Sequence, residues 1–146
     1  MTADAKDPNT AARVRDSFAR QTMLASIGAV VETVAPGHVV LAAPVAAAFC
    51  QQQGFAHGGL IFTLGDCAAG YAALSVMPPD VEVMTAELKI NLLSPGQGRL
   101  VAEGRVLKAG RRLVVVAADV WAEIGTGGPR RQVAALQGTM VPVPIG

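Results

Sequence analysis

The feature that most constrains this chain is a nearly uninterrupted apolar stretch, residues 58–77, with a carboxylate, Asp66, near its centre. A polar, glycine-punctuated loop precedes it and ends in His57-Gly58-Gly59. Burying an unpaired carboxylate is costly, so a chain rarely does so without a chemical or structural reason. The sequence therefore directs attention to Asp66 and to the loop before it.

The apolar stretch reaches the length of about 20 residues that a bilayer span needs, but its composition favours burial inside a globular protein. A central Asp costs roughly 2.5–3.5 kcal/mol on membrane-insertion scales, and no Lys or Arg cluster flanks either end. With 146 residues, 51% hydrophobic and 16% charged, the chain suits one domain over 1–146, with an N-terminal extension and short helix over 1–23. So little charge also indicates surface buried against partner subunits, and no membrane contact is expected.

Charge and cysteines exclude several other classes of protein. The net charge is +1, and its even spread leaves no electrostatic footprint for nucleic acid. The N-terminal residues are polar and lack the apolar core of a cleavable signal. Cys50 and Cys67 are expected to be reduced core thiols of a cytoplasmic protein. Together with His38 and His57 they lack metal-ligand spacing, so neither metal nor cofactor is expected.

Hydrophobic periodicity predicts an α+β protein. A first helix is expected from Asn9 or Thr10 to about Met23, with the apolar stretch as a long central helix. Strands are expected over 30–34, 38–43, 82–93, 100–108, 113–123 and 131–143. In 87–92 polar and apolar residues alternate, the pattern of a sheet with one solvated face. The connecting turns are too short for crossover helices, so we expect a curved antiparallel sheet wrapped around the long helix.

The start of the central helix is suited to holding a developing oxyanion. Gly58 and Gly59 supply backbone N–H groups without partners in the helix, and the helix dipole adds positive potential there. Asp66 lies about 12 Å further along the axis, at 1.5 Å per residue. One helix therefore cannot bring both its glycine N–H groups and Asp66 to the same carbonyl carbon. If both act together, Asp66 must meet the glycines of another subunit, which predicts a homodimer with shared sites and, from two dimers, a homotetramer.

These residues resemble the hotdog-fold acyl-CoA thioesterases of the phenylacetate-degradation (PaaI) type. The likeness covers roughly residues 20–142. It rests on Gly-x-x-His-Gly-Gly, an acidic residue nine positions after the His, Ser-Pro after the next strand, and a basic Gly-Arg turn. The resemblance implies the hotdog fold and the hydrolysis of acyl-CoA thioesters to free acid and CoA.

Position by position, the resemblance also implies roles for individual residues. Gly58 corresponds to the family's oxyanion donor, and Asp66 to its catalytic carboxylate, which acts as nucleophile or as general base on water. Thr85 corresponds to a hydroxyl residue that places this carboxylate or the water. Gln51 stands where many members have an Asn that contacts the thioester carbonyl or the water. Its extra methylene leaves open whether the contact shifts or passes to Gln52.

Other residues of the pattern have two readings. His57 is either a general base or, the interpretation we favour, a hydrogen-bonding residue that shapes the loop, with Gly59 beside it at the substrate. Lys108, Arg111 and Arg112 flank the turn at Gly110. They form either a solvated hairpin tip or a clamp for the phosphates of CoA.

Each catalytic residue also has a structural alternative. Asp66 could be a paired core carboxylate, and Thr85 an ordinary strand residue. Cys67, the neighbour of Asp66, could be a nucleophile paired with a His. A helical neighbour of Asp66 points about 100° away, however, and a small buried Cys is the commoner case.

Alternative functions share the same fold. A non-catalytic hotdog module that binds acyl-CoA would gain nothing from an expensive buried carboxylate. A hotdog dehydratase or hydratase would need a His and an acid placed for proton abstraction, whereas Gly-Gly after His57 fits the thioesterase pattern better. The few aromatic residues near the predicted pocket do not distinguish aryl from medium-chain acyl groups.

Overall fold

The computed structural model describes residues 8–146, so the first seven residues of the expected N-terminal extension lie outside the described part. The helices are α1 (Thr10–Ala19), α2 (Thr22–Ser26) and α3 (Gly58–Leu74), with a short 3-10 helix at Ala47–Phe49. The strands are β1 (Val30–Ala35), β2 (His38–Pro44), β3 (Val81–Leu92), β4 (Arg99–Ala109), β5 (Val114–Glu123) and β6 (Arg130–Pro144).

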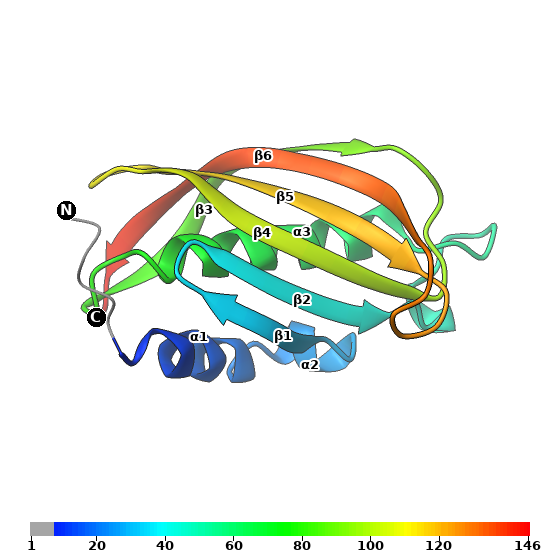
Figure 1. Cartoon of the computed structure of the whole chain (residues 1–146), viewed down its shortest axis with the longest axis horizontal. Helices are drawn as coiled ribbons and strands as arrows, with labels where there is room; N and C mark the ends of the chain where they lie inside the picture. Colours follow the sequence, from blue (N-terminus) through cyan, green and yellow to red (C-terminus); the bar gives the residue numbers. More distant parts are fainter. Residues whose placement is uncertain (1–7) are drawn as a thin grey trace.

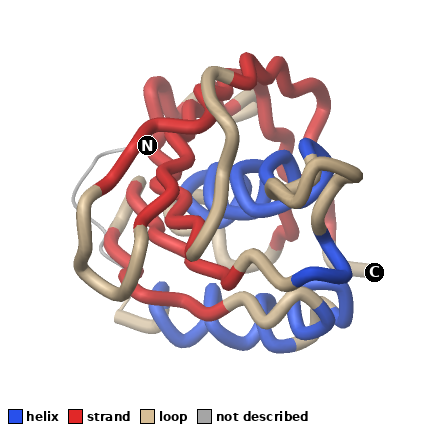
Figure 2. The backbone as a smooth tube through the Cα atoms, turned by 90° about the vertical axis from the view of Figure 1, so that its right-hand side faces the viewer, coloured by secondary structure: helices blue, strands red, loops and turns tan. Residues whose placement is uncertain are grey.

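The strands form one six-stranded sheet in the order β1-β2-β4-β5-β6-β3, and every neighbouring pair is antiparallel. Figure 1 shows the strands lying over α3, with α1 and α2 one after the other along the β1 edge. In the perpendicular view of Figure 2 the sheet curves around α3. The predicted curved antiparallel sheet with one central helix is therefore confirmed.

The helix fits against the sheet because small residues let the two backbones approach closely. A Cβ atom added at Gly104 of β4 would lie 2.2 Å from the backbone of Ala68 in α3. Leu64 and Leu74 of α3 are completely buried in the core that forms between helix and sheet. Among residues 8–146 no helix is long and apolar enough to cross a membrane.

The prediction of one N-terminal helix reaching Met23 is wrong. The helix ends at Ala19, Gln21 is extended (φ −84°, ψ 101°), and a second helix begins at Thr22. Long-range contacts set this break: the Gln21 side-chain amide donates a hydrogen bond of 2.7 Å to the Tyr71 hydroxyl of α3. The new direction lets α2 bury Leu24.

The expected buried face of β3 is only partly confirmed. Leu88 and Ile90 are half-buried, but Leu92 is 58% exposed. Within the described part of the chain, strand β3 lies at the edge of the sheet and pairs with β6 on one side only. Its side chains therefore lack the neighbours that a strand inside the sheet would have.

Candidate active site

Asp66 and Thr85 meet between α3 and β3. The Thr85 hydroxyl donates a hydrogen bond of 2.7 Å to Asp66 Oδ1 and also lies 3.3 Å from Met140 Sδ. The Asp66 side chain is half-buried, and this burial raises the pKa of its carboxyl group above the ordinary value, while the hydrogen bond from Thr85 opposes the rise. Among the described residues no other hydrogen bond reaches Asp66, so its second oxygen is open to a water or a ligand.

His57 caps the helix and shapes its first turn. Its Nδ1 accepts a hydrogen bond of 2.8 Å from the Gly59 N–H, so in the neutral ring the proton is on Nε2. The side chain contact agrees with the loop-shaping reading of His57. Within residues 8–146 no acceptor bonds the N–H of Gly58, the first residue of α3. This donor lies at the positive end of the helix dipole, where an oxyanion would be stabilised.

The glutamines of the loop are arranged differently from one another. Gln51 Oε1 accepts the N–H of Gln53 at 2.6 Å and that of Phe55 at 3.4 Å, so it closes its own loop. Gln51 Nε2 donates to the side-chain oxygen of Gln53 at 3.3 Å. Gln52 is exposed. In this arrangement the Gln51 oxygen is occupied. The Gln51 amide nitrogen carries two hydrogens and donates one of them to Gln53, so the other can bond a substrate.

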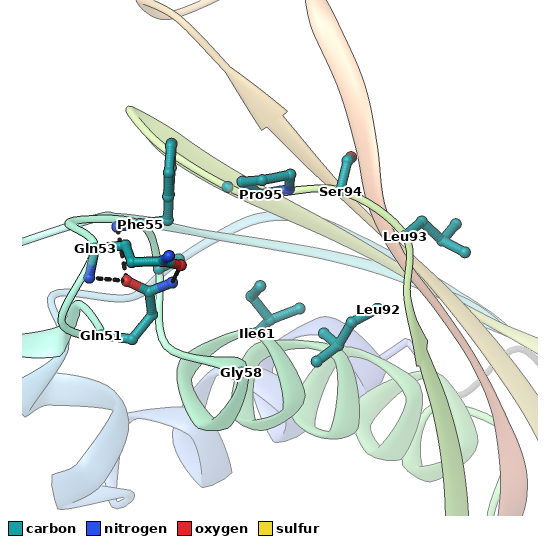
Figure 3. A pocket seen from close by; sticks show the side chains of 11 residues that line it. Gln51, Gln53, Phe55, Gly58, Ile61, Leu92, Leu93, Ser94 and Pro95 are labelled. Carbon is teal, nitrogen blue, oxygen red and sulfur yellow. Dashed lines mark hydrogen bonds between the residues drawn. The ribbon is translucent and has the colours of Figure 1, made fainter.

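A cavity of about 430 Å³ opens beside Gly58, and we call it the loop cavity. It is lined by Gln51, Gln53 and Phe55 of the loop, by Gly58 and Ile61 of α3, and by residues 92–96. Figure 3 shows the loop on one side of the start of α3 and the segment that follows β3 on the other.

Asp66 does not line the loop cavity. Within one chain the structure thus brings Gly58 and Gln51 together at one place, and Asp66 and Thr85 at another.

The sequence did not single out the apolar part of the loop-cavity wall. Leu92 approaches the start of α3 so closely that a Cβ added at Gly58 would lie 3.2 Å from its Cδ1 atom. Ser94 and Pro95 belong to the Ser-Pro motif, which was the available signal for this wall. The alternating pattern of β3 predicted Leu92 on a buried face, so the sequence did not indicate that this residue lines a cavity.

The basic residues lie on the β4–β5 hairpin, far from Gly58 of the same chain. The Gly110 N–H donates to the Leu113 carbonyl at 2.9 Å, which places Arg111 and Arg112 at the tip. Both arginines and Lys108 are exposed and make no ion pair with the described residues. In Figure 1 this tip and the start of α3 lie at opposite ends of the molecule.

The cysteines do not occupy the core as expected. Both are free thiols, and both are half-buried. Burial and then the charge of Asp66 raise the pKa of the Cys67 thiol to about 12. A thiol with so high a pKa carries almost no thiolate near neutral pH, which argues against a nucleophilic Cys67.

The chain matches the family model described as the Thioesterase superfamily over residues 53–128, about half of its length, including both Gly58 and Asp66. The chain belongs to the thioesterase superfamily. A solved structure of a thioesterase family protein from Silicibacter pomeroyi is 40% identical, with a TM-score of 0.88, and the match covers 93% of this chain and 99% of that one. The hotdog fold expected from the sequence is confirmed.

The fold also matches the E. coli PaaI protein of the phenylacetic acid degradation operon. The TM-score is 0.81 at 20% identity, and the match covers 92% of this chain and 94% of that one. At this identity the likeness concerns the fold alone.

Curated relatives of this superfamily member carry esterase names. A Saccharolobus solfataricus protein named "putative esterase" is 38% identical over 81 residues, 55% of this chain and 57% of that protein. A Halobacterium salinarum protein with the same description is 31% identical over 103 residues, 67% of this chain and 68% of that protein. The chain thus spans little more than half the length of the first relative.

Proposed function

We propose that this protein hydrolyses acyl-CoA thioesters to free acid and CoA, and that it does so in the cytoplasm. The observation that carries the proposal is the half-buried Asp66 carboxylate, held by Thr85 with one oxygen open. Membership of the thioesterase superfamily supports the type of bond that is cleaved. The exposed cations of the β4–β5 turn fit the phosphates of CoA.

In the proposed reaction, Asp66 either takes a proton from a water that attacks the thioester carbonyl, or attacks this carbon itself. Burial raises the pKa of the Asp66 carboxyl group, which makes it a stronger base than an exposed one. As the tetrahedral oxyanion forms, the Gly58 N–H donates to it at the positive end of α3. The C–S bond then breaks. In the general-base route the thiolate leaves with the proton that Asp66 took from water, and the remaining hydroxide has become the hydroxyl of the acid. In the nucleophilic route the thiolate leaves a mixed anhydride of Asp66 and the acyl group, and water then hydrolyses this anhydride, which releases the acid, restores the carboxylate and supplies the proton for the thiolate.

The site is proposed to be shared between two chains. Gly58 and Asp66 belong to one helix, about 12 Å apart along its axis, and Asp66 is absent from the cavity beside Gly58. If Gly58 of one chain faces Asp66 of its partner, donor and base reach the same carbonyl. We therefore propose a homodimer, with two dimers in a homotetramer.

A non-catalytic acyl-CoA-binding module is the alternative. Such a protein needs the cavity and the cations but has no use for a partly desolvated carboxylate with a raised pKa. Asp66 therefore favours the hydrolase.

The deciding experiment exchanges Asp66 for Asn, which keeps size and polarity but removes the charge. Turnover of acyl-CoA, measured by release of free thiol, should fall by at least about 100-fold. Binding of acyl-CoA and the dimer should persist, because the carboxylate is needed for the reaction more than for ground-state affinity. Near wild-type turnover of Asp66→Asn on its best substrate would show that Asp66 is structural.

Mixing two damaged chains tests the shared site. Gly58→Pro removes the donor N–H, so both homodimers, Asp66→Asn and Gly58→Pro, should be inactive. The heterodimer should regain one working site, made from the intact Asp66 of one chain and the intact Gly58 of the other. Folded heterodimers without recovered activity would contradict the shared arrangement.

A further inference from the structure

A second cavity adjoins the start of α3, on the side facing α2, and we call it the α2 cavity. Its volume is about 600 Å³. Met23 and Ser26 of α2, with Ile27 directly after the helix, form one wall, and Phe49 and Phe62 form another. It reaches His57 and Gly59, the residues on either side of the Gly58 donor. A ligand whose carbonyl lies at Gly58 therefore has two cavities into which its two ends can extend.

The α2 cavity offers almost no hydrogen bonds to a ligand. Its hydroxyls, Ser26 and Thr63, and its thiol, Cys50, each donate to the backbone carbonyl four residues earlier, at 2.9, 2.8 and 3.4 Å. Among residues 8–146, no Asp, Glu, Lys or Arg side chain lines it. Apart from the His57 ring, its wall is therefore apolar in effect.

The loop cavity differs in this respect. Its wall carries the amides of Gln51 and Gln53, and the Gln53 amide nitrogen has no acceptor among residues 8–146. Amide groups of a ligand can find partners there. The two cavities on either side of Gly58 thus differ in polarity.

The two arms of a thioester such as acyl-CoA also differ in polarity. The acyl group is a hydrocarbon, whereas the thiol arm contains amides. We propose that the acyl group occupies the α2 cavity, so that α2 determines acyl specificity, and that the thiol arm passes through the loop cavity. This proposal rests on the proposed function, because it assumes a thioester carbonyl at Gly58. The acyl group selected is an uncharged alkyl or aryl group, since a charged one would be desolvated against an apolar wall.

The proposal can be tested by measuring how affinity depends on the length of the acyl group. Burying one methylene group strengthens binding about fourfold, so affinity should rise steeply with chain length until the cavity is filled. The probes are S-butyl-CoA and S-octyl-CoA, thioethers that the enzyme cannot hydrolyse. With the wild-type protein, S-octyl-CoA should bind at least about tenfold more tightly than S-butyl-CoA.

Two tryptophan variants on the same helix give a matched comparison. Ser26→Trp puts a large side chain into the cavity, whereas Ala25→Trp adds the same side chain at an exposed neighbour that does not line it. Ser26→Trp should reduce the octyl-to-butyl ratio of affinities at least about fivefold, and Ala25→Trp should leave it within about twofold. Met23→Glu, which places a charge at the exposed rim, should also lower the ratio.

The outcomes separate this proposal from the proposed function. Equal ratios in the wild-type, Ser26→Trp and Met23→Glu proteins would overturn the α2 assignment, even if Asp66-dependent hydrolysis is observed. A lowered ratio in a protein that hydrolyses no acyl-CoA would support the α2 cavity and refute the hydrolase. Dissociation of the oligomer by Ser26→Trp, with no change in the ratio, would show that this surface is an interface between copies and not an acyl pocket.

Discussion

Two opposing effects act on Asp66, and Thr85 is responsible for one of them. Burial raises the pKa of the carboxyl group because it disfavours the charged form, whereas the hydrogen bond from Thr85 favours that form. A general base or nucleophile must be deprotonated to act. The activity of the enzyme should therefore increase as the pH rises through the pKa of Asp66.

Replacing Thr85 by Val removes the hydroxyl and keeps a β-branched side chain. Since the lost hydrogen bond lowered the pKa of Asp66, this pKa should rise, and the acidic limb of the pH profile of kcat/KM should move to higher pH. The plateau value should fall by roughly 10- to 100-fold, because the carboxylate is no longer held in position. Steady-state rates across the pH range give both quantities.

Thr85→Ser is the control for this prediction. Ser can donate the same hydrogen bond, so the acidic limb should stay close to its wild-type position. If Thr85→Val reduces the plateau but leaves the limb unmoved, the titrating group is not Asp66, and the role given to its raised pKa is wrong.

Individual residues of the site differed in how far the sequence could predict them. The contact of Asp66 with Thr85 follows from one residue on the central helix and one on the strand beside it, as the resemblance implied. The Gln51 side chain could not be predicted in this way. Its oxygen is taken by the N–H groups of its own loop, and this depends on backbone geometry that a residue type does not specify.

The turn of the β4–β5 hairpin places its cationic side chains at the tip. The hydrogen bond from Gly110 to Leu113 closes a turn with Arg111 and Arg112 as its central residues. The register of the sheet places this hairpin end level with Thr85. Ala109 of β4 pairs with Val114 of β5, Val114 pairs with Met140 of β6, and Met140 pairs with Thr85 of β3. The cations thus lie at the end of the sheet that carries Thr85, the hydrogen-bond partner of Asp66.

If this hairpin binds the phosphates of CoA, changing both Arg111 and Arg112 to Ala should raise KM for acyl-CoA by roughly tenfold or more. A truncated thioester of N-acetylcysteamine lacks the nucleotide and should be affected little. Arg15→Ala/Arg131→Ala is a matched control, because it removes two exposed arginines that make no ion pair with the described residues. Equal effects on both substrates would show that the hairpin is a solvated turn and not a clamp for phosphates.

Elements with strong local signals were predicted, and those placed by distant contacts were not. Turn residues such as Pro36 and Gly37 mark the ends of strands, so the strand boundaries agree with the structure within a few residues. The break between α1 and α2 has no Pro or Gly to announce it, since it depends on Gln21 reaching Tyr71. The pairing of β3 with β6 instead of β4 was likewise invisible, because periodicity identifies a strand and not its neighbour.

At the scale of the whole molecule, two surfaces that the other described residues leave uncovered adjoin the proposed site. Strand β3 forms one edge of the sheet and exposes apolar side chains, with Met84 57% and Leu92 58% exposed. On α3, Phe62, Thr63 and Asp66 are only half-buried. Because Asp66 and Gly58 are separated within one chain, a partner covering these surfaces would complete the site and bury the exposed apolar groups together.

The assembly prediction is therefore tied to activity. Light scattering at micromolar concentration should give at least twice the 14.9 kDa of one chain. Met84→Glu places a charge on the β3 edge and should shift the protein toward monomers, with turnover falling in parallel, because a buried unpaired charge is costly in an interface. Ile124→Glu makes the same exchange at a residue that is 69% exposed on the β5–β6 turn, and it should leave both mass and turnover unchanged. A wild-type monomer with full activity would refute the shared site, because Asp66 and Gly58 of one chain cannot act on the same carbonyl.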